Sequence, residues 1–416
     1  MLIHSASQLI ILAGGPQRGQ RLGQLGIITD GAILIQDGKI IAVGQSEQLL
    51  ADYPQEPQLD AGDCVVMPGF VDPHTHLIWA GDRAVEFEMR LEGKTYLEIL
   101  AAGGGILSTV NATRQASLET LLVETRPRML AMLEHGTTTA EAKTGYGLNT
   151  DSELRMLEAL IMLDEQSPLQ LAITFLGAHA IAPEYKDNPQ GYTDLLCEEM
   201  LPAVRNWWPG DRQLPFVDVF CETGAFDLNQ SRQILSRAAE LGFPLKIHAD
   251  EFDNLGGAAL AAELGAVSAD HLVATSEADI KTLAESDTVA VGLPGTPFGL
   301  AEENYTPAKT ILEAGGLLAL ATDLNPGTSW CENMQFAIAL ACRYMGLTPA
   351  QAIAAATINA AAAIDLADQI GSLEPGKQGD LLILKTPSYQ HLGYRFGTNL
   401  VKTVVKRGEV VFQSQS

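Results

Sequence analysis

The sequence predicts an α/β protein built on a (β/α)8 barrel of the TIM type, with a small β-sandwich domain formed from both chain termini. Two observations predict this fold. Short apolar runs alternate with amphipathic stretches along most of the chain, and period-two hairpin patterns lie near both ends. Strand–helix units with right-handed crossovers give a parallel sheet, and eight such units close into a barrel.

Each expected barrel strand is a short apolar run with a polar residue at or just after its end. These strands cover residues 65–76, 137–143, 169–179, 216–222, 244–251, 266–272, 288–294 and 316–323. Helices are expected at 154–166, 230–241, 276–285, 307–313, 333–345 and 349–367. The last of them follows Thr348, Pro349 and Gln351, a capping-box start with proline in the first turn.

Both ends of the chain carry hairpin signals. Residues 32–43 alternate around Asp37-Gly38, and residues 403–412 turn at Arg407-Gly408 after a further apolar run at 381–384. Neither end holds enough strands for a stable sheet of its own. We therefore expect residues 1–66 and 372–416 to form one composite β domain, and residues 67–371 to form the barrel.

Composition narrows the class of protein. The 416 residues include 46% apolar residues, enough for a large core, and carry a net charge of −25. That charge argues against nucleic acid or an anionic membrane as partner, and an anionic substrate would need a local cation. No apolar run reaches the roughly 18 residues of a membrane span, and the N-terminus lacks a signal peptide's basic region. The five cysteines show no close-paired spacing, so we expect reduced thiols in a cytoplasmic protein.

His74-Thr75-His76 closes the first apolar run and is the most informative feature of the chain. Side chains alternate faces along a strand, so these two imidazoles point the same way. Two neutral imidazoles on one face make half of a metal site, since zinc binds ring nitrogens at about 2.0–2.1 Å.

Ionisable residues collect at the expected strand ends, where barrel chemistry is located. In chain order they are His74, His76, Lys143, His179, Glu222, His248, Glu251, His271 and Asp323. Five of the eight histidines belong to this set. Random placement would scatter them over helices and loops, so the regularity indicates one site.

Three histidines and one carboxylate could hold one divalent ion and leave a position for water; they are His74, His76, His248 and Asp323. Asp323 could instead bind backbone amides of the turn that follows it. Glu251 is placed to move a proton. His271 could polarise a carbonyl oxygen or bind the water, or it could be a satisfied core histidine.

The segment 68–76 resembles the first-strand signature of the amidohydrolase superfamily, metal-dependent hydrolases on this barrel. Within that superfamily, five segments resemble the imidazolonepropionase family. They are residues 80–83 together with 86–88 and 90–91, then 102–106, 141–148, 248–251 and 322–328. The family more often has serine where this chain has Thr144 and Thr322, and both changes are conservative.

The resemblance implies roles residue by residue. The metal ligands would be His74, His76, His248 and Asp323, with zinc or iron as the ion. Substrate contacts would come from Arg83, Tyr146, His179 and Glu251, and from the loop residues Asn325, Gly327 and Thr328. The implied reaction is hydrolysis of the ring amide of 4-imidazolone-5-propanoate to N-formimino-L-glutamate, with water activated by the metal, Glu251 as proton shuttle and His271 stabilising the oxyanion. A guanidinium at Arg83 would bind the propanoate carboxylate, unless it pairs with Glu86 at the surface.

Two other classes of protein compete with this interpretation. One is a different amidohydrolase, such as a deaminase of a nucleobase-like ring, against which Tyr146, Arg83 and the 325–328 turn weigh. The other is a non-catalytic scaffold, which would have no need of the complete ligand set with Glu251 and His271. Bound metal and hydrolytic turnover would separate these classes. A homodimer is the expected assembly.

Overall fold

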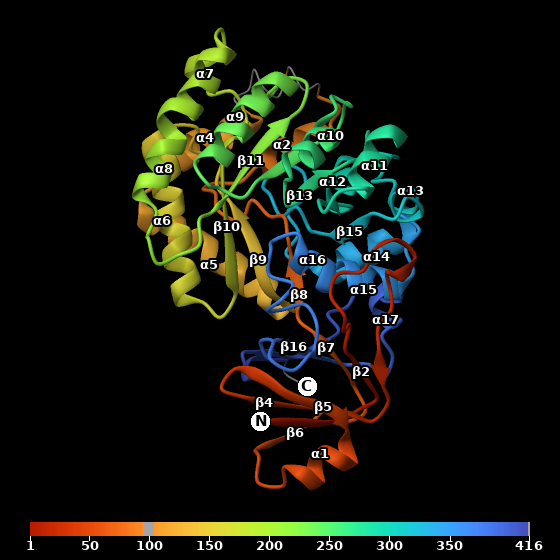
Figure 1. The fold of residues 1–416 in the computed structure, drawn as a ribbon. Helices are drawn as coiled ribbons and strands as arrows, with labels where there is room; N and C mark the ends of the chain where they lie inside the picture. Colours follow the sequence, from red (N-terminus) through yellow and green to blue (C-terminus); the bar gives the residue numbers. More distant parts are fainter. Residues whose placement is uncertain (95–97, 99–103, 415–416) are drawn as a thin grey trace.

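The computed structural model describes residues 1–94, 98 and 104–414. Ala102 and Gly103, which belong to one of the segments compared above, lie outside the described residues. A barrel ringed by helices forms the larger part of the molecule, and a layered β domain lies below it, near both termini (Figure 1). Within the described residues, no helix has the length and apolar character needed to cross a membrane.

Eight parallel strands form the barrel, as the sequence predicted. They are β8 (Phe70–Asp72), β9 (Thr137–Lys143), β10 (Gln170–Ala178), β11 (Phe216–Cys221), β12 (Lys246–Ala249), β13 (Ser268–His271), β14 (Val289–Gly292) and β15 (Leu317–Leu320). Each strand pairs with the next along the chain. The first and last strands meet just beyond their ends, where Thr75 forms a parallel bridge with Leu324. Asp72 adds a second link, because its carboxylate accepts hydrogen bonds from the Thr322 N–H (3.1 Å) and hydroxyl (2.5 Å).

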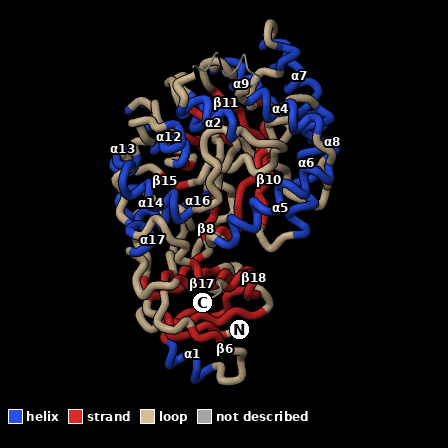
Figure 2. The backbone as a smooth tube through the Cα atoms, turned by 180° about the vertical axis from the view of Figure 1, so that it is seen from behind, coloured by secondary structure: helices blue, strands red, loops and turns tan. Residues whose placement is uncertain are grey.

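Helices surround the strands (Figure 2). Those after β8 to β11 are α2 (Ala84–Leu91), α4 (Ile106–Gln115), α5 (Leu118–Glu134), α6 (Thr150–Gln166), α7 (Pro189–Leu195), the π-helical turn η3 (Leu196–Met200), α8 (Leu201–Trp207) and α9 (Leu228–Glu240). The later ones are α10 (Gly257–Leu264), α11 (Glu277–Ala284), α12 (Gly295–Leu300), α13 (Ala308–Glu313), α14 (Met334–Tyr344), α15 (Pro349–Ala355), α16 (Ile358–Ala362) and α17 (His391–Tyr394). Thr348 and Gln351 form the expected capping box.

The single helix expected at 349–367 is wrong, because the structure divides it into α15 and α16. Thr357 lies at the break with φ −133° and ψ −93°. Its hydroxyl donates to the Ile353 carbonyl at 2.6 Å, a side-chain bond of the kind that bends or interrupts helices.

The single strand expected at 65–76 is also wrong. Its first part is β7 (Val65–Pro68), which belongs to the small domain, and β8 starts after Gly69. A Cβ atom at Gly69 would lie 2.3 Å from Thr138 Oγ1, so only glycine allows the chain to pass this close to β9. The domain boundary expected after residue 66 therefore falls inside β7.

The small domain is a sandwich of two sheets built from both termini. One sheet has the order β5-β4-β1-β6, and the other has the order β18-β17-β16-β7-β2-β3. The strands are β1 (Leu2–Ala6), β2 (Gln8–Ile10), β3 (Ile27–Ile28), β4 (Gly31–Gln36), β5 (Lys39–Gln45), β6 (Gln58–Asp60), β16 (Leu381–Leu384), β17 (Val401–Lys406) and β18 (Glu409–Gln413); helix α1 (Ser46–Asp52) packs against the first sheet. Ile33 and Ile35 of one sheet share a core with Val66 and Ile383 of the other.

Both expected hairpin turns are confirmed. Asp37-Gly38 has φ angles of 48° and 75°, and Arg407-Gly408 has 49° and 78°. Two consecutive positive φ angles are typical of the type I′ turn that matches the twist of paired strands. Because β7 leads directly into β8, the sandwich lies at the amino end of the barrel, and the functional strand ends point away from it.

Candidate active site and metal centre

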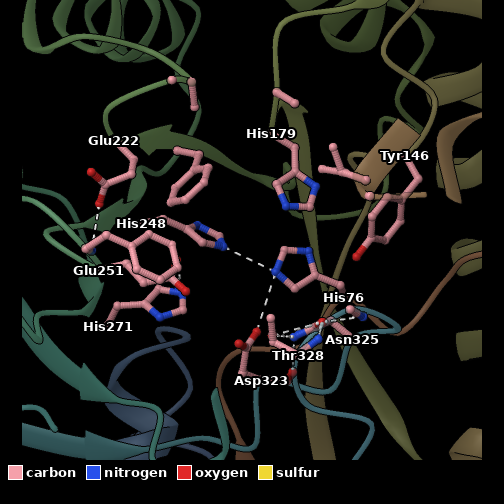
Figure 3. A pocket seen from close by; sticks show the side chains of 18 of the residues that line it. His76, Tyr146, His179, Glu222, His248, Glu251, His271, Asp323, Asn325 and Thr328 are labelled. Atoms are coloured by element: carbon pink, nitrogen blue, oxygen red, sulfur yellow. Dashed lines mark hydrogen bonds and ion pairs between the residues drawn. The ribbon is translucent and has the colours of Figure 1, made fainter. Parts of the chain in front are cut away.

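The carboxyl ends of the barrel strands surround a cavity of about 650 Å³. His76, Tyr146, His179, His248, Glu251, His271 and Asp323 line it, and Figure 3 shows their side chains gathered there. Arg83, Glu222, Asn325, Gly327 and Thr328 also line the cavity. Except for His74, which lies beneath it, every residue expected to bind metal or substrate therefore lines one cavity.

The four residues expected as metal ligands approach one another closely. His248 Nε2 lies 3.2 Å from His76 Nε2, and Asp323 Oδ1 lies 3.5 Å from His74 Nε2 and 3.6 Å from His76 Nε2. Atoms bound tetrahedrally to one zinc ion at about 2.0–2.1 Å lie about 3.4 Å from each other. The spacing therefore fits a single ion.

Carboxylates lie behind two of the imidazoles. Asp270 Oδ2 lies 2.6 Å from His74 Nδ1, and Asp218 Oδ2 lies 3.0 Å from His248 Nδ1. The hydrogen bond from His74 to Asp270 holds the proton on Nδ1 and leaves Nε2 free as a ligand, the usual arrangement behind metal-binding histidines. The approach of Asp218 to His248 Nδ1 is an ion-pair contact without hydrogen-bond geometry. Both Nε2 atoms point to the same place in the barrel.

Asp323 follows β15 in the left-handed region, with φ 55°. Its Oδ2 accepts the Thr296 hydroxyl, whereas its Oδ1 has no hydrogen-bond donor among the described residues. Burial raises the pKa of Asp323 to about 6. The backbone amides of the following turn are instead bound by Asn325, whose Oδ1 accepts from the Gly327 and Thr328 N–H groups at 2.8 Å. The unpaired Oδ1 is a polar atom suited to a cation.

His74, His76 and His271 have the protonation that metal binding requires. Burial lowers the pKa of His74, His76 and His271 well below the usual value, so these imidazoles stay neutral at physiological pH. His74 Nε2 has no hydrogen-bond partner among the described residues. These neutral nitrogens, together with the open carboxylate oxygen of Asp323, are suited to a metal ion.

His271 and Glu251 lie beside this cluster. His271 ends β13, and its Nε2 is 3.6 Å from Glu251 Oε2. His271 is also close enough to His74 and Asp323 to complete an alternative set of three metal ligands. Burial, followed by the nearby charges of Asp323 and Glu222, raises the pKa of Glu251 well above the usual value. A carboxyl group whose pKa is raised in this way is suited to carrying a proton.

A layer of buried charges lies beneath the site, and the sequence analysis missed most of it. Lys143 Nζ contacts Glu141 Oε1 at 2.8 Å and Asp218 Oδ2 at 2.7 Å. Lys246 Nζ lies 3.3 Å from Glu141 Oε1 and 3.8 Å from Asp270 Oδ2. The two-residue spacing along a strand could have indicated three of these charged residues. Glu141 lies on the same strand face as Lys143, and Lys246 on the same face as His248. Asp270 likewise shares a face with Ser268.

Lys143 is expected to be a strong determinant of stability. Burial alone would lower its pKa, but Asp218, Glu141 and Asp270 outweigh it and raise the pKa above the usual value. Lys143→Met would leave these carboxylates under-compensated, so the free energy of unfolding should fall by about 3–5 kcal/mol. Urea unfolding measures this change.

The matched control is Arg232→Met, which breaks an ion pair with Glu263 between side chains 41% and 58% exposed. Exposed pairs contribute about 0–1 kcal/mol, so this variant should unfold almost like the parent protein. Equal effects of the two substitutions would contradict the role given to the buried layer.

Arg83 makes the ion pair with Glu86 and also lies on the cavity wall. Its Nε donates to Glu86 Oε2 at 2.9 Å, and its Nη2 donates to Glu86 Oε1. Glu86 Oε2 also accepts the Gly105 N–H at 2.7 Å. The guanidinium nevertheless lines the cavity, with Nη1 so close to Gly327 that a Cβ atom there would lie 2.4 Å from it. Arg83 is thus paired and still available to an anion.

Tyr146 and His179 form a second wall of the cavity. His179 stacks on His76 with ring centroids 4.7 Å apart, and its Nδ1 lies 3.0 Å from the Gly145 carbonyl. Burial raises the pKa of the Tyr146 hydroxyl and lowers that of His179 to about 3. Both side chains are neutral, which suits contacts with an uncharged heterocycle.

Comparison with known sequences gives consistent results. The amidohydrolase family matches residues 65–411, and an imidazolonepropionase-like composite domain of bacteria matches residues 31–55. The chain is 52% identical to the imidazolonepropionase of Herpetosiphon aurantiacus, covering 100% of this chain and 97% of the relative. It is 49% identical to that of Symbiobacterium thermophilum, covering 99% and 97%.

Solved structures of low sequence identity share the fold. An adenosine deaminase from Xanthomonas campestris with bound zinc aligns with a TM-score of 0.70 at 20% identity, over 98% of this chain and 92% of the other. A 5-methylcytosine deaminase from Klebsiella pneumoniae aligns with a TM-score of 0.74 at 18% identity, over 100% and 98%. At such identities the likeness concerns the fold alone.

Proposed function

The chain belongs to the amidohydrolase family and, within it, to the imidazolonepropionases, and from this premise we propose the reaction that it catalyses. The reaction is hydrolysis of the ring amide of 4-imidazolone-5-propanoate to N-formimino-L-glutamate. One observation carries the proposal: a single cavity is lined by His76, His248 and Asp323, by the carboxylate of Glu251 and by the guanidinium of Arg83, with His74 beneath it.

One divalent zinc or iron ion per subunit is the proposed cofactor, held by Nε2 of His74, His76 and His248 and by Asp323 Oδ1. Charge balance supports a divalent ion. In the buried layer, the carboxylates of Glu141, Asp218 and Asp270 outnumber the ammonium groups of Lys143 and Lys246 by one. Asp323 adds a second negative charge. Such an ion, when bound, supplies Lewis acidity and a water of lowered pKa.

The side chains around this centre account for the proton transfers. Glu251 accepts a proton from the water that adds to the ring carbonyl, and delivers it to the ring nitrogen as the C–N bond breaks. Neutral His271 donates its N–H to the oxygen that gains negative charge. Asp323 accepts a hydrogen bond from the water and orients it.

Substrate binding is assigned to the rest of the cavity wall. Arg83 binds the propanoate carboxylate through the edge of its guanidinium that Glu86 leaves free. Tyr146 and His179 contact the ring, and Asn325, Gly327 and Thr328 contact substrate or product. In a protein with a net charge of −25, a fixed cation is needed to hold an anionic substrate.

Arg83→Met tests this assignment. The variant keeps much of the stem but loses a charge-assisted contact worth about 1.5–3 kcal/mol. We expect kcat/KM to fall roughly 10- to 150-fold, mostly through KM, because the contact is equal in ground and transition states. Steady-state kinetics should be repeated with an imidazolone lacking the carboxylate. That analogue should lose little further activity in the variant; an equal loss for both substrates would mean that Arg83 only supports its loop.

Direct assay decides the function as a whole. The metal-loaded protein is incubated with freshly prepared 4-imidazolone-5-propanoate, and formation of N-formimino-L-glutamate is followed by mass spectrometry. A deaminase would instead release ammonia from a nucleobase-like ring and leave the imidazolone unchanged. A homodimer and a cytoplasmic location remain predictions beside this proposal.

A further inference from the structure

Glu222 is a buried carboxylate on the cavity wall that the reaction as proposed does not use. It follows β11 directly, and its side chain turns toward the loop that carries Glu251 (Figure 3). The residue is only 3% exposed. A buried carboxylate needs donors, so its partners reveal its role.

The partners of Glu222 are backbone N–H groups on two loops. Its Oε1 accepts from Thr223 at 2.8 Å and from Asp253 at 3.2 Å. Its Oε2 accepts from Phe252 at 2.9 Å and from Asp253 at 3.3 Å. Phe252 and Asp253 immediately follow Glu251. Glu222 therefore ties the end of β11 to the segment just beyond the proton carrier.

The residue before Glu251 is anchored independently. Asp250 has a positive φ of 54°, and its carboxylate accepts from the Gly257 N–H at 3.3 Å and the Thr275 hydroxyl at 2.9 Å. Glu251 is thus held between two anchors, while its own carboxylate lies 3.6 Å from His271 Nε2. The Phe252 side chain is 50% exposed and adds little packing.

We propose that Glu222 is a positioning residue. By holding the backbone at Phe252 and Asp253, it fixes the distance between the Glu251 carboxylate and the reacting atoms. This inference rests on the proposed function, in which Glu251 carries the proton. Proton transfer needs a donor–acceptor distance of about 2.6–3.2 Å, so a small displacement of the loop separates Glu251 from the reacting atoms. The negative charge of Glu222 also contributes to the raised pKa of Glu251.

Glu222→Gln is the test, because it keeps the size of the side chain. In either orientation its NH2 group faces a backbone N–H, so the bond to Thr223 or the bond to Phe252 is lost. We expect kcat to fall roughly 10- to 100-fold with little change in KM, as for a misplaced catalytic group. Metal content should remain that of the parent. Hydrogen–deuterium exchange should be faster at the Phe252 and Asp253 amides, a readout that needs no substrate.

Two further variants separate positioning from simple charge loss. Glu302 is exposed and also raises the pKa of Glu251, but it makes none of these backbone contacts; Glu302→Gln should keep parental kcat. Glu222→Gln in a Glu251→Gln background should cause no further loss, because both changes act through the same proton carrier.

Three outcomes would overturn the proposal: parental kcat in Glu222→Gln, equal losses in the Glu222 and Glu302 variants, or additive losses in the double variant. Failure of the proposed function can be told apart from failure of the positioning proposal by assaying the parent enzyme. If the proposed function is wrong, the parent enzyme leaves the imidazolone intact. In that case the exchange measurement still reports whether Glu222 holds the loop.

Discussion

The His248→Ala variant is expected to fold, to lose its metal ion and to lose nearly all turnover. His248 supplies one of three converging Nε2 atoms, and its Nε2 is 3.2 Å from that of His76. Lewis-acid assistance is worth several kcal/mol, and each 1.4 kcal/mol changes a rate about tenfold, so the rate should fall by at least roughly 10³-fold. Elemental analysis and turnover of the same preparation measure both effects. The fold should persist because Asp218, which loses its histidine, keeps its contact with Lys143 at 2.7 Å.

Chelation provides the independent arm of this experiment. Prolonged chelation of the parent protein should abolish turnover, and zinc or ferrous iron should restore it. His4→Ala is the matched control, because His4 lies on β1 of the sandwich, away from the strand ends that carry the cavity. It should retain both metal and activity. Full turnover in a preparation shown to contain no metal would refute the proposed centre.

The sequence alone was enough to place the residues around the cavity, for a topological reason. Every strand of a parallel barrel delivers its last side chains to the same rim, so a polar residue after an apolar run has a known location. His74 and Asp323 are separated by about 250 positions, yet barrel closure brings His74 Nε2 within 3.5 Å of Asp323 Oδ1. The barrel topology alone therefore brings these residues together, without knowledge of any individual residue–residue contact.

The layer beneath the site does not lie at the strand ends, so the position of a polar residue after an apolar run does not reveal it. Glu141, Asp218 and Lys246 lie within buried strands, where an isolated charge would be costly. Glu141 has Lys143 on its own strand, but the ion-pair partners of Asp218 and Lys246 lie on other strands. Those partners depend on register, which one sequence does not specify. The break at Thr357 was missed for a local reason, because a hydroxyl bond to the preceding turn competes with a helical pattern that continues on both sides.

The Glu251→Gln variant is expected to bind metal like the parent and to lose turnover by about 10²–10⁴-fold, the usual contribution of a general acid–base group. Glutamine keeps the size and hydrogen-bonding shape of the side chain but cannot carry a proton. The contrast with His248→Ala is the informative part. The two residues are three positions apart on one strand end, yet only the histidine is assigned to the metal.

Metal content and single-turnover rate should therefore separate the two variants. In Glu251→Gln the substrate should still bind, so KM should change less than kcat. Loss of metal from Glu251→Gln is the result that would contradict this prediction. Asp323 and His271 both lie close to Glu251, and His271 can complete an alternative ligand set with His74 and Asp323. If the Glu251 variant loses metal together with activity, the division between ligands and proton carrier is wrong, and Glu251 belongs to the coordination of the ion.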